Sequence, residues 1–384
     1  MTVLQGVKVL EFAGLAPVPY AGMILADFGA SVTRIDRLHS IGLETFDALG
    51  RSKRSVSIDL KQKKGIEIVK RLSLNSDVII EPYRPGVMEK LGLGPNTLMK
   101  DNPRLIYARL TGFGQKGPFS SRAGHDINYS GLSGILSMLG RHGDKPLAPL
   151  NILADLAGGG LTCCLGILLA LFERTKSGKG QIIDSSMVHG SAYLSTFFHK
   201  TVNFGIWSGE RGTNVLDGGA PFYDTYETSD GKYVAVGALE PQFYQLLVKG
   251  LNLDKEFPDQ MDTSSWQNMR SRFTEKFSSK TRDEWCEIFD GTDACVSPVL
   301  SLSEAPKHQQ NVANDVFIAN SNGMLEPSPA PKLSRTPGHV VSLKQPSLGQ
   351  DTCEALKECG YSLEDIAELK REAVIHCGVM KSSL

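Results

Sequence analysis

Val7-Lys-Val-Leu-Glu-Phe12 is a short apolar run typical of a buried strand, and it begins the part of the chain that decides the fold. Residues 17–28 follow with apolar side chains at helical spacing, which predicts a helix with one face against a sheet. Ser31-Val-Thr-Arg-Ile-Asp36 then predicts a second strand. A strand, a helix and a strand in this order favour a parallel pair joined by a right-handed crossover.

The same alternation continues along the chain. Residues 66–74 predict a helix, and strands are predicted at Asp77–Glu81, Leu105–Leu110 and Gly180–Asp184. Repeated units of this kind predict an α/β fold whose large domain has a doubly wound, Rossmann-like parallel sheet. Ligands of such sheets bind at the carboxyl ends of the strands.

The pattern changes after about residue 208. A predicted hairpin at 222–238 and three amphipathic helices after it indicate a smaller α+β domain. Residues 304–347, rich in Pro, Ser and Asn, are typical of a linker or an extended return path. We therefore divide the chain into a large α/β domain (1–200), a linker (201–220), a small α+β domain (221–303), a return linker (304–340) and a C-terminal segment (341–384) that packs on the large domain.

Length and charge limit the function. At 384 residues the chain is long enough for two domains. Lys and Arg together number 41 against 42 for Asp and Glu, and this formal net charge of -1 argues against nucleic acid as a partner. Any anionic ligand must therefore be bound by a local basic cluster.

Several features bear on the compartment. The seven cysteines include no C-x-x-C pair, so the sequence indicates neither a disulfide framework nor a thiolate metal site and favours a reducing compartment. The N-terminus lacks the regions of a secretory signal. Residues 152–172 are apolar enough to span a bilayer, but Asp155 and the glycines 158–160 favour a buried helix of a soluble protein. Ser382-Ser-Leu384 resembles a peroxisomal S-K-L signal, with an ordinary polar tail as the alternative.

Basic residues gather at the end of the second predicted strand and beyond it. Arg37 ends that strand, and the cluster continues with Arg51, Lys53, Arg54, Lys61, Lys63 and Lys64. Strand-end placement favours a phosphorylated ligand for the three arginines as much as a solvated face. Lys63 and Lys64 are expected on the surface.

Gly112-Phe-Gly-Gln-Lys-Gly117 has the G-x-G-x-x-G spacing of nucleotide-binding loops and follows a predicted strand. Pro118 and the residues after it show no helical periodicity, so no helix N-terminus is predicted for a pyrophosphate. We prefer a shaped loop that leads to His125.

Ala123-Gly-His-Asp-Ile-Asn-Tyr129 and Asn151-Ile-Leu-Ala-Asp155 each place an ionisable side chain at the edge of an apolar, glycine-rich run. Such surroundings can desolvate an acid or base and shift its pKa. We expect His125 and Asp155 to face each other across one substrate carbon. Taken singly, each also fits a structural role, as a hydrogen-bonding histidine and a helix cap. The sequence has no G-x-S-x-G or H-E-x-x-H motif to support a hydrolase or a zinc protease.

Ordered motifs carry a family resemblance. They are Ala123–Tyr129, Asn151–Asp155 with Gly158–Gly160, Leu216-Asp-Gly-Gly-Ala-Pro-Phe-Tyr223, Gly237-Ala-Leu-Glu-Pro-Gln-Phe-Tyr244 and Asp293-Ala-Cys-Val-Ser-Pro-Val299. Together they resemble the racemase branch of the family III CoA-transferase (CaiB/BaiF) superfamily, from Leu4 to about Pro337. The resemblance implies an isomerase that interconverts (2R)- and (2S)-2-methylacyl-CoA by 1,1-proton transfer through an enolate. It also implies no metal or other cofactor, since CoA is part of the substrate.

The resemblance implies roles for individual residues. His125 and Asp155 are expected as acid/base groups on opposite faces of the α-carbon, with Glu240 supporting His125 from the other subunit. The backbone N–H groups of Asp155 and Leu156 are expected to bind the enolate oxygen. CoA is expected to contact Arg37, Ile58, Asp59, Leu60 and Lys61 at its nucleotide, Tyr83 and Arg84 along its pantetheine, and Gly124, Asp126, Ile127, Asn128 and Tyr129 at the thioester, with Arg51 and Arg54 as further candidates.

The resemblance further implies an interlocked homodimer of ring-shaped chains with the active site at the interface. It places the reaction in the oxidation of branched-chain fatty acids and bile-acid-type side chains, in peroxisomes, mitochondria or both. One alternative is a CoA transferase of the same superfamily, in which Asp155 attacks the thioester to form an acyl-enzyme anhydride. The motifs around His125 and Glu240 favour the racemase. The other alternative is a non-catalytic acyl-CoA binding protein. Such a protein would use the same basic cluster to bind CoA, but it would not need two ionisable groups at the thioester.

Overall fold

The computed structural model describes residues 2–38, 48–204, 207, 209–320 and 323–378. The chain forms two compact units. The larger unit combines Met1–Ser133, Pro149–Leu194 and Asp315–Leu384, and the smaller unit combines Gly134–Ala148 and Ser195–Asn314. The expected targeting tail, residues 382–384, lies outside the described residues.

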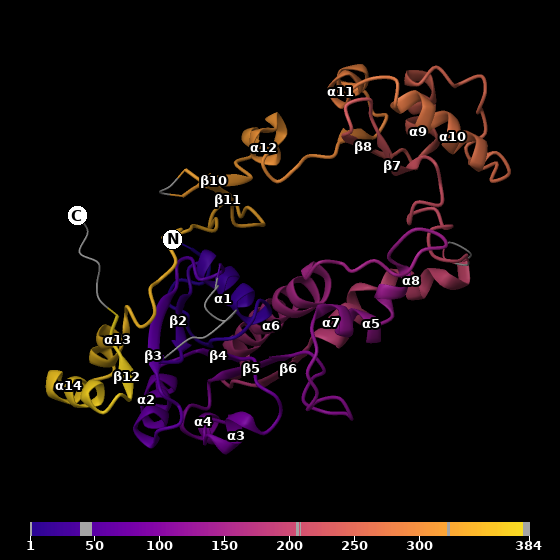
Figure 1. The fold of residues 1–384 in the computed structure, drawn as a ribbon. Coiled ribbons are helices and arrows are strands. Elements are labelled where there is room, and N and C mark those ends of the chain that lie inside the picture. The colour runs from indigo at the N-terminus through magenta and orange to yellow at the C-terminus, as the bar shows by residue number, and fades with distance from the viewer. Residues whose placement is uncertain (1, 39–47, 205–206, 208, 321–322, 379–384) are drawn as a thin grey trace. The chain divides into compact units, whose positions relative to one another are not determined.

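A seven-stranded sheet forms the centre of the larger unit (Figure 1). Its order is β12-β3-β2-β1-β4-β5-β6. The strands are Lys8–Phe12 (β1), Ser31–Asp36 (β2), Arg54–Ile58 (β3), Val78–Glu81 (β4), Ile106–Thr111 (β5), Ile182–Ser186 (β6) and Ile375–His376 (β12). Strands β1 to β6 are parallel, and the edge strand β12 runs antiparallel to β3. The predicted parallel sheet is confirmed, with its change of direction between β1 and β4.

Helices cover both faces of this sheet. Successive side chains of its strands point to opposite faces, and because both sets are apolar, each face needs a layer of helices to bury it. Val9 and Ile106 belong to one core, Leu10 and Tyr107 to the other. The first core includes α1 (Pro17–Asp27), α5 (Asp126–Leu132), a π-helix (Ile152–Leu161), α6 (Thr162–Ser177) and α7 (Met187–Leu194). The second includes α2 (Lys63–Leu74), α3 (Val87–Lys90), α4 (Pro95–Asp101), α13 (Thr352–Glu358) and α14 (Leu363–Arg371).

The C-terminal segment completes the sheet. Strand β12 pairs Ile375 with Ile58 of β3. Cys353 at the start of α13 and Cys377 after β12 form a disulfide with their Cα atoms 6.1 Å apart, which corrects the expectation that the cysteines form none. Cysteine spacing did not reveal this pair, because the two residues meet only through the packing of α13 and β12 on β3.

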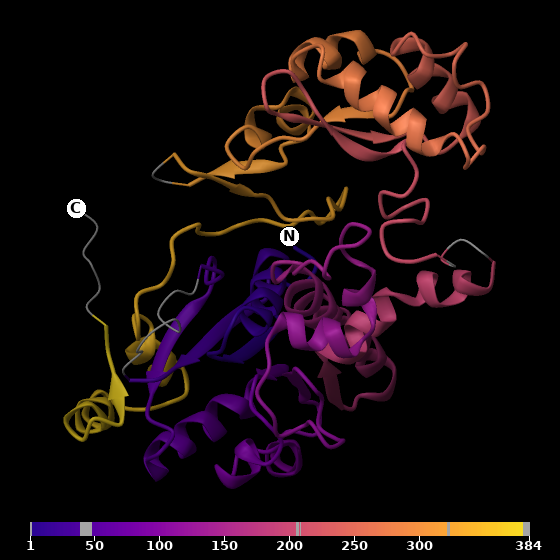
Figure 2. The ribbon, with the colours of Figure 1, turned by 45° about the vertical axis from the view of Figure 1, so that its right-hand side comes forward.

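The smaller unit has a three-stranded antiparallel sheet in the order β7-β8-β9, formed by Tyr223–Glu227, Tyr233–Gly237 and Val296–Pro298. Helices α9 (Pro241–Gly250), α10 (Trp266–Phe277) and α11 (Arg282–Phe289) lie beside this sheet (Figure 2). They share a core rich in aromatic side chains with it. Helix α8 (Thr196–Thr201) precedes them in the chain. The predicted hairpin and its three helices are confirmed.

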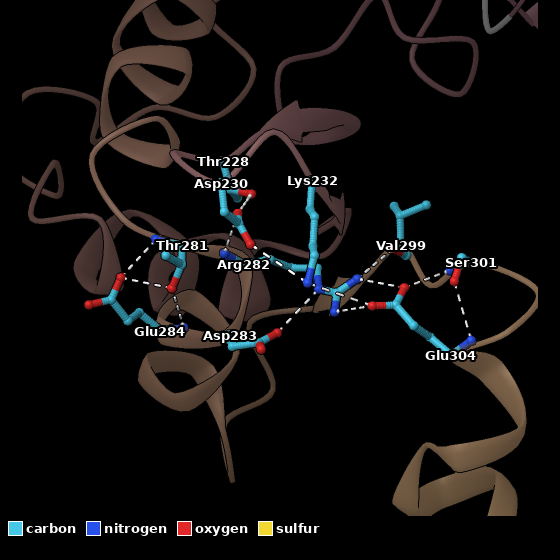
Figure 3. A network of polar contacts seen from close by, with 10 residues as sticks. All are labelled: Thr228, Asp230, Lys232, Thr281, Arg282, Asp283, Glu284, Val299, Ser301 and Glu304. Carbon is cyan, nitrogen blue, oxygen red and sulfur yellow. Dashed lines mark hydrogen bonds and ion pairs between the residues drawn. The ribbon is translucent and has the colours of Figure 1, made fainter.

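A polar network holds the start of α11 against the end of the small sheet (Figure 3). Arg282 donates to Glu304 at 2.9 Å and to the carbonyl of Val299 at 3.2 Å. The guanidinium holds the pKa of Glu304 well below its usual range. Thr281 and Glu284 form a capping box, which explains why the helix begins here.

The stretch from 304 to 340, expected as a linker without regular structure, carries short elements. They are a 3-10 turn (Ala305–Lys307), α12 (Gln309–Ala313) and the antiparallel pair β10 (Phe317–Ala319) and β11 (Leu325–Pro327). Each is five residues or fewer, so none is long enough to produce a periodic pattern.

Among the described residues, one helical run is long and apolar enough to cross a bilayer, Ile152–Ser177. Its inner side chains, including Cys163 and Ile167, are buried against the sheet. Its outer face is apolar and exposed at Leu161, Leu165, Leu168, Leu169 and Phe172. The expectation of a buried helix therefore holds for one face alone.

Candidate active site

A cavity of about 520 Å³ lies at the carboxyl ends of β1, β4 and β5. Its lining includes Gly14 after β1, Pro82 after β4 and Phe113 after β5. The strand order reverses between β1 and β4, so the cavity occupies the position where doubly wound sheets bind ligands. His125 and Asp155, the two ionisable residues that the sequence singled out, both line it.

His125 is the N-cap residue, immediately before α5. Its backbone is extended, and its N–H donates to the side chain of Asn128 at 3.1 Å. This bond satisfies the start of the helix from inside its first turn. The imidazole is left exposed at the cavity, where it can exchange a proton with a ligand.

Asp155 lies in the π-helix and is half-buried. Burial first, and the charge of Asp126 second, raise the pKa of Asp155 to about 6, while His125 acts in the opposite direction. A carboxyl group with this pKa populates both protonation states near neutral pH. It can therefore both take and give a proton.

Glycine explains how the π-helix approaches its neighbours. A Cβ atom on Gly158 would lie 2.7 Å from the backbone nitrogen of Ser191 in α7. One on Gly160 would lie 2.8 Å from the carbonyl oxygen of Pro17 in α1. Because no side chain fits between these backbones, the glycine run lets the segment that carries Asp155 pack directly on α1 and α7.

Tyr129 holds the loop that precedes His125. Its hydroxyl donates to the carbonyl of Gly124, and its ring packs edge-on against Phe113 with the centroids 5.0 Å apart. Burial, and then the nearby charge of Asp155, raise the pKa of Tyr129 to about 12. The hydroxyl is therefore a hydrogen-bond donor at neutral pH. Gly124 and Tyr129, which the resemblance led us to expect at the thioester, both line the cavity.

The N–H groups expected to bind an enolate oxygen are already engaged. The N–H of Asp155 donates to the carboxylate of Asp126 at 2.8 Å, and the N–H of Leu156 donates to the carbonyl of Asn151 at 3.3 Å. This corrects the assignment of the enolate site to Asp155 and Leu156. It also places the Asp126 side chain, which is 4% exposed, in the interior and not at a ligand.

Three further residues expected to bind CoA line the cavity: Arg37 directly after β2, and Tyr83 and Arg84 after β4. Ile127 and Asn128, expected at the thioester, are exposed on α5 and outside the lining. The carboxyl-end loops therefore bring together the residues expected along the pantetheine and at one end of the nucleotide.

The segment Ile58, Asp59, Leu60 and Lys61 lies at the same edge of the sheet, outside the cavity lining. The hydroxyl of Ser57 donates to the carbonyl of Arg37 at 3.1 Å, which joins the ends of β3 and β2. Ile58 is 1% exposed and Leu60 packs against the core, so neither presents its side chain to solvent freely. Asp59 accepts from the N–H of Lys61 at 3.0 Å, and this turn leaves the Lys61 side chain exposed.

Arg51 and Arg54 are paired elsewhere. Arg51 is buried, with a bond of 2.6 Å to Asp27, and Arg54 donates to Glu358 of α13 at 2.8 Å. These ion pairs argue against the phosphate-binding role expected from the charge cluster. The sequence could not reveal them, because Glu358 lies 304 positions from Arg54. Lys63 and Lys64 are exposed, as predicted.

Glu81 binds the backbone of the loop that forms one wall of the cavity. It ends β4, is fully buried, and accepts from the N–H of Tyr83 at 2.6 Å and from Arg109 at 2.9 Å. Arg109 also donates to Glu89 of α3 at 2.7 Å. Burial raises the pKa of Glu81 to about 7 in spite of Arg109. The cluster fixes the loop that carries Tyr83 and Arg84.

Arg122 is a cavity residue that the sequence did not single out. It lines the cavity with its guanidinium 3.8 Å from the centre of the Phe119 ring. Its place in the loop after β5, shortly before His125, is the signal that could have found it.

Glu240 belongs to the smaller unit, where it precedes α9 and is exposed. Its side chain makes no capping hydrogen bond to the helix, so it is not held there as a cap. Its support of His125 stays a prediction. Within the described part of the chain, His, Cys, Asp and Glu side chains form no group of three or more that could hold a metal ion.

Two ionisable side chains, His125 and Asp155, line a cavity at the switch point of a doubly wound sheet with arginines beside them, an arrangement suited to proton transfer on an anionic ligand. The chain belongs to CoA-transferase family III, whose family model matches residues 4–352. The resemblance inferred from the motifs is confirmed.

Two relatives and one solved structure are most informative. Alpha-methylacyl-CoA racemase of Mus musculus is 56% identical over 383 residues and covers 100% of both chains. The protein of that name in Homo sapiens is 53% identical over 384 residues, covering 99% of this chain and 100% of the relative. A CaiB/BaiF family protein from Brucella suis has a TM-score of 0.81 at 25% identity, covering 93% of this chain and 99% of that one.

Proposed function

We propose that this chain racemises 2-methylacyl-CoA thioesters, the reaction that the names of its relatives describe. One observation carries the proposal: His125 and Asp155 line one cavity in a chain that is 56% identical to such a racemase over its whole length. The reaction inverts the α-carbon, so it needs one group to remove a proton from one face and another to return a proton to the opposite face.

His125 and Asp155 exchange the roles of acid and base when the direction of racemisation is reversed. In one direction the Asp155 carboxylate removes the α-proton, and protonated His125 returns one to the opposite face of the enolate. In the other direction neutral His125 is the base and the Asp155 carboxylic acid is the donor. Each group ends in the protonation state with which the reverse reaction begins. The pKa of about 6 for Asp155 makes both states available.

The enolate oxygen is assigned to the first turn of α5. The first N–H groups of a helix have no partners within it, and α5 begins immediately after His125 at the cavity. The N–H of Asp126, the residue that follows the cavity-lining His125, is the donor that we propose in place of those expected at Asp155 and Leu156.

The CoA moiety is proposed to follow the carboxyl edge of the sheet. Arg37, Arg84 and Arg122 line the cavity, and Lys61 is exposed at the end of β3. These residues supply local positive charge in a chain whose formal net charge is -1. The proposed reaction uses no metal or redox cofactor. We place it in branched-chain and bile-acid-type acyl oxidation, in peroxisomes, mitochondria or both.

We further propose that the chain acts as an interlocked homodimer with its sites at the interface. The exposed apolar face at the end of the π-helix and along α6, at Leu161, Leu165, Leu168, Leu169 and Phe172, supports a dimer, because apolar stripes of this size are usually covered. Glu240 of one subunit is proposed to support His125 of the other.

Subunit complementation tests the trans arrangement. Glu240→Ala and Asp155→Ala chains are co-expressed with different tags, and the mixed dimer is purified through both. If Glu240 acts in trans, one site of the mixed dimer has an intact Asp155 and an intact partner Glu240. Its activity is then expected to reach about half the wild-type value.

Both homodimers, purified in the same way, are the controls and are expected to show far less activity. A mixed dimer no more active than the two homodimers would place Glu240 in the same chain as its site. Failure to isolate any mixed dimer, with a monomer in sedimentation, would contradict the homodimer itself.

Exchange in heavy water tests the reaction. Wild-type protein is incubated with one epimer of a 2-methylacyl-CoA, and deuterium at the α-carbon is followed by mass spectrometry and NMR alongside the epimer ratio. We expect both deuterium exchange and epimerisation without any added carboxylic acid to accept CoA. Deuterium enters because the two acid/base groups exchange protons with solvent between turnovers. Absence of exchange would exclude the racemase. CoA transfer to an added carboxylic acid would then indicate the transferase, and binding alone a non-catalytic protein.

A further inference from the structure

Asp126 occupies an unusual position between the two reacting groups. It follows His125 directly in the chain, yet its side chain points to the π-helix that carries Asp155. Its carboxylate oxygen Oδ2 accepts from the N–H of Ala154 at 2.7 Å and from the N–H of Asp155 at 2.8 Å. The residue is 4% exposed.

We propose that Asp126 is a positioning residue, which fastens the π-helix to α5 and keeps a fixed negative charge beside Asp155. The inference rests on the proposed racemase function. It assigns Asp126 a role that the expected contact with CoA did not include.

The geometric part of the role follows from the two hydrogen bonds. The first N–H groups of a helix need acceptors, and a carboxylate is a strong one there. Because the acceptor sits next to His125, it ties the backbone of Asp155 to the residue adjacent to the opposing base. The separation of the two acid/base groups therefore depends on hydrogen bonds from one buried carboxylate to the backbone of the π-helix, and not on loosely packed side chains.

The electrostatic part follows from the burial of the charge. The second oxygen, Oδ1, is buried without a hydrogen-bond partner in the part of the chain that the structure describes. A buried charge of this kind acts strongly on its neighbours, since little solvent screens it. Asp126 opposes ionisation of Asp155, His125 favours it, and Tyr129 faces Asp155 with a neutral hydroxyl. Asp126 thereby preserves the carboxylic acid form that one direction of the reaction requires.

Asp126→Asn separates charge from position. The amide oxygen can still accept from both N–H groups, whereas the negative charge is lost. Asp155 then ionises more readily, so the acid limb of the kcat/KM profile is expected to move to lower pH by about one unit. At pH 7 we expect kcat/KM to fall by a factor of about 3 to 10, because the less basic Asp155 carboxylate removes the α-proton more slowly. The fall is equal in both directions because the overall equilibrium is unchanged. Asp126→Ala loses both contacts and is expected to lower kcat by about a hundredfold.

Asp184→Asn is the matched control. Asp184 also accepts a backbone N–H, from Gln115 at 3.1 Å, but it is not among the charges that act on Asp155. Its substitution is expected to leave the acid limb in place. If Asp126→Asn shows an unmoved pH profile, or a loss of rate that is uniform with pH, the electrostatic part of the role is overturned. An Asp126→Ala variant that folds and keeps the wild-type kcat overturns the fastening of the π-helix.

The outcomes distinguish this inference from the proposed function. Wild-type protein that exchanges the α-hydrogen, with an Asp126→Asn profile like that of the wild type, overturns the electrostatic role of Asp126 alone. Wild-type protein without exchange overturns both. Thermal unfolding of each variant shows whether it folds, and the near-isosteric Asn variant carries the test if the Ala variant does not.

Discussion

Asp155→Ala and His125→Ala are each expected to lower the rate of epimerisation by about a thousandfold, because inversion needs an acid/base group on both faces of the α-carbon. The measurement is the epimer ratio with time from each pure epimer. Binding of CoA, followed by calorimetric titration, is expected to change little, because the residues proposed for CoA are untouched.

Each variant is expected to keep half of the chemistry. The group that survives can still remove and return a proton on its own face, so each variant should exchange the α-hydrogen of one epimer in heavy water without inverting it. The two variants should prefer opposite epimers. His142→Ala, which removes an exposed histidine of the smaller unit, is the control and should keep the wild-type rate. Full turnover by either active-site variant would refute the assigned roles.

Lys53→Met is expected to lower the free energy of unfolding by about 3 to 5 kcal/mol. The Lys53 ammonium lies 2.7 Å from one carboxylate oxygen of Glu11 and also donates to the carbonyl of Pro19 at 2.8 Å. Both side chains are completely buried. Removing the lysine takes away the cation that donates to both oxygens of the buried Glu11 carboxylate. Denaturant unfolding at pH 7 measures the change.

Two controls separate this effect from loss of charge in general. The double variant Glu11→Leu, Lys53→Met removes both charges and is expected to recover most of the stability. Lys64→Ala removes an exposed lysine paired with Glu368 and Glu372, and is expected to change stability little. A Lys53→Met protein as stable as the wild type would show that Glu11 is not held as a buried charge.

The buried pair also matters for the site. Glu11 lies in β1, just before the loop that lines the cavity, and Pro19 lies in α1, whose Pro17 lines the cavity. Lys53 therefore connects the two elements that form one wall of the switch point. In the sequence, Lys53 is one member of the basic cluster that begins at Arg37. Its partner Glu11 is 42 positions away, and only the packing of β3 near β1 brings the two together.

The part of the candidate site that follows predicted strands could be predicted from the sequence. Arg37, Tyr83, Arg84, His125 and Asp155 all line the cavity. The first three follow predicted strands, and parallel strands carry their carboxyl ends to one edge. Asp126 was expected to contact the thioester, but its side chain is buried and accepts hydrogen bonds from the π-helix. Its neighbours Ala154 and Asp155 are 28 and 29 positions away, so its hydrogen bonds depend on how α5 meets the π-helix.

The sequence by itself determined the strands β1, β2, β4, β5 and β6, the parallel sheet, the family and the pair His125 and Asp155, but it missed the strands β3 and β12. The features that it determined follow from local periodicity and from ordered motifs, which do not depend on distant contacts. The tertiary structure alone decided which charges reach the cavity. Arg51, Lys53 and Arg37 look alike in the sequence, but the first two meet buried carboxylates of distant elements, and Arg37 lines the cavity. Burial and pairing between distant segments set the environment of a charge, and that environment exists only in the folded chain.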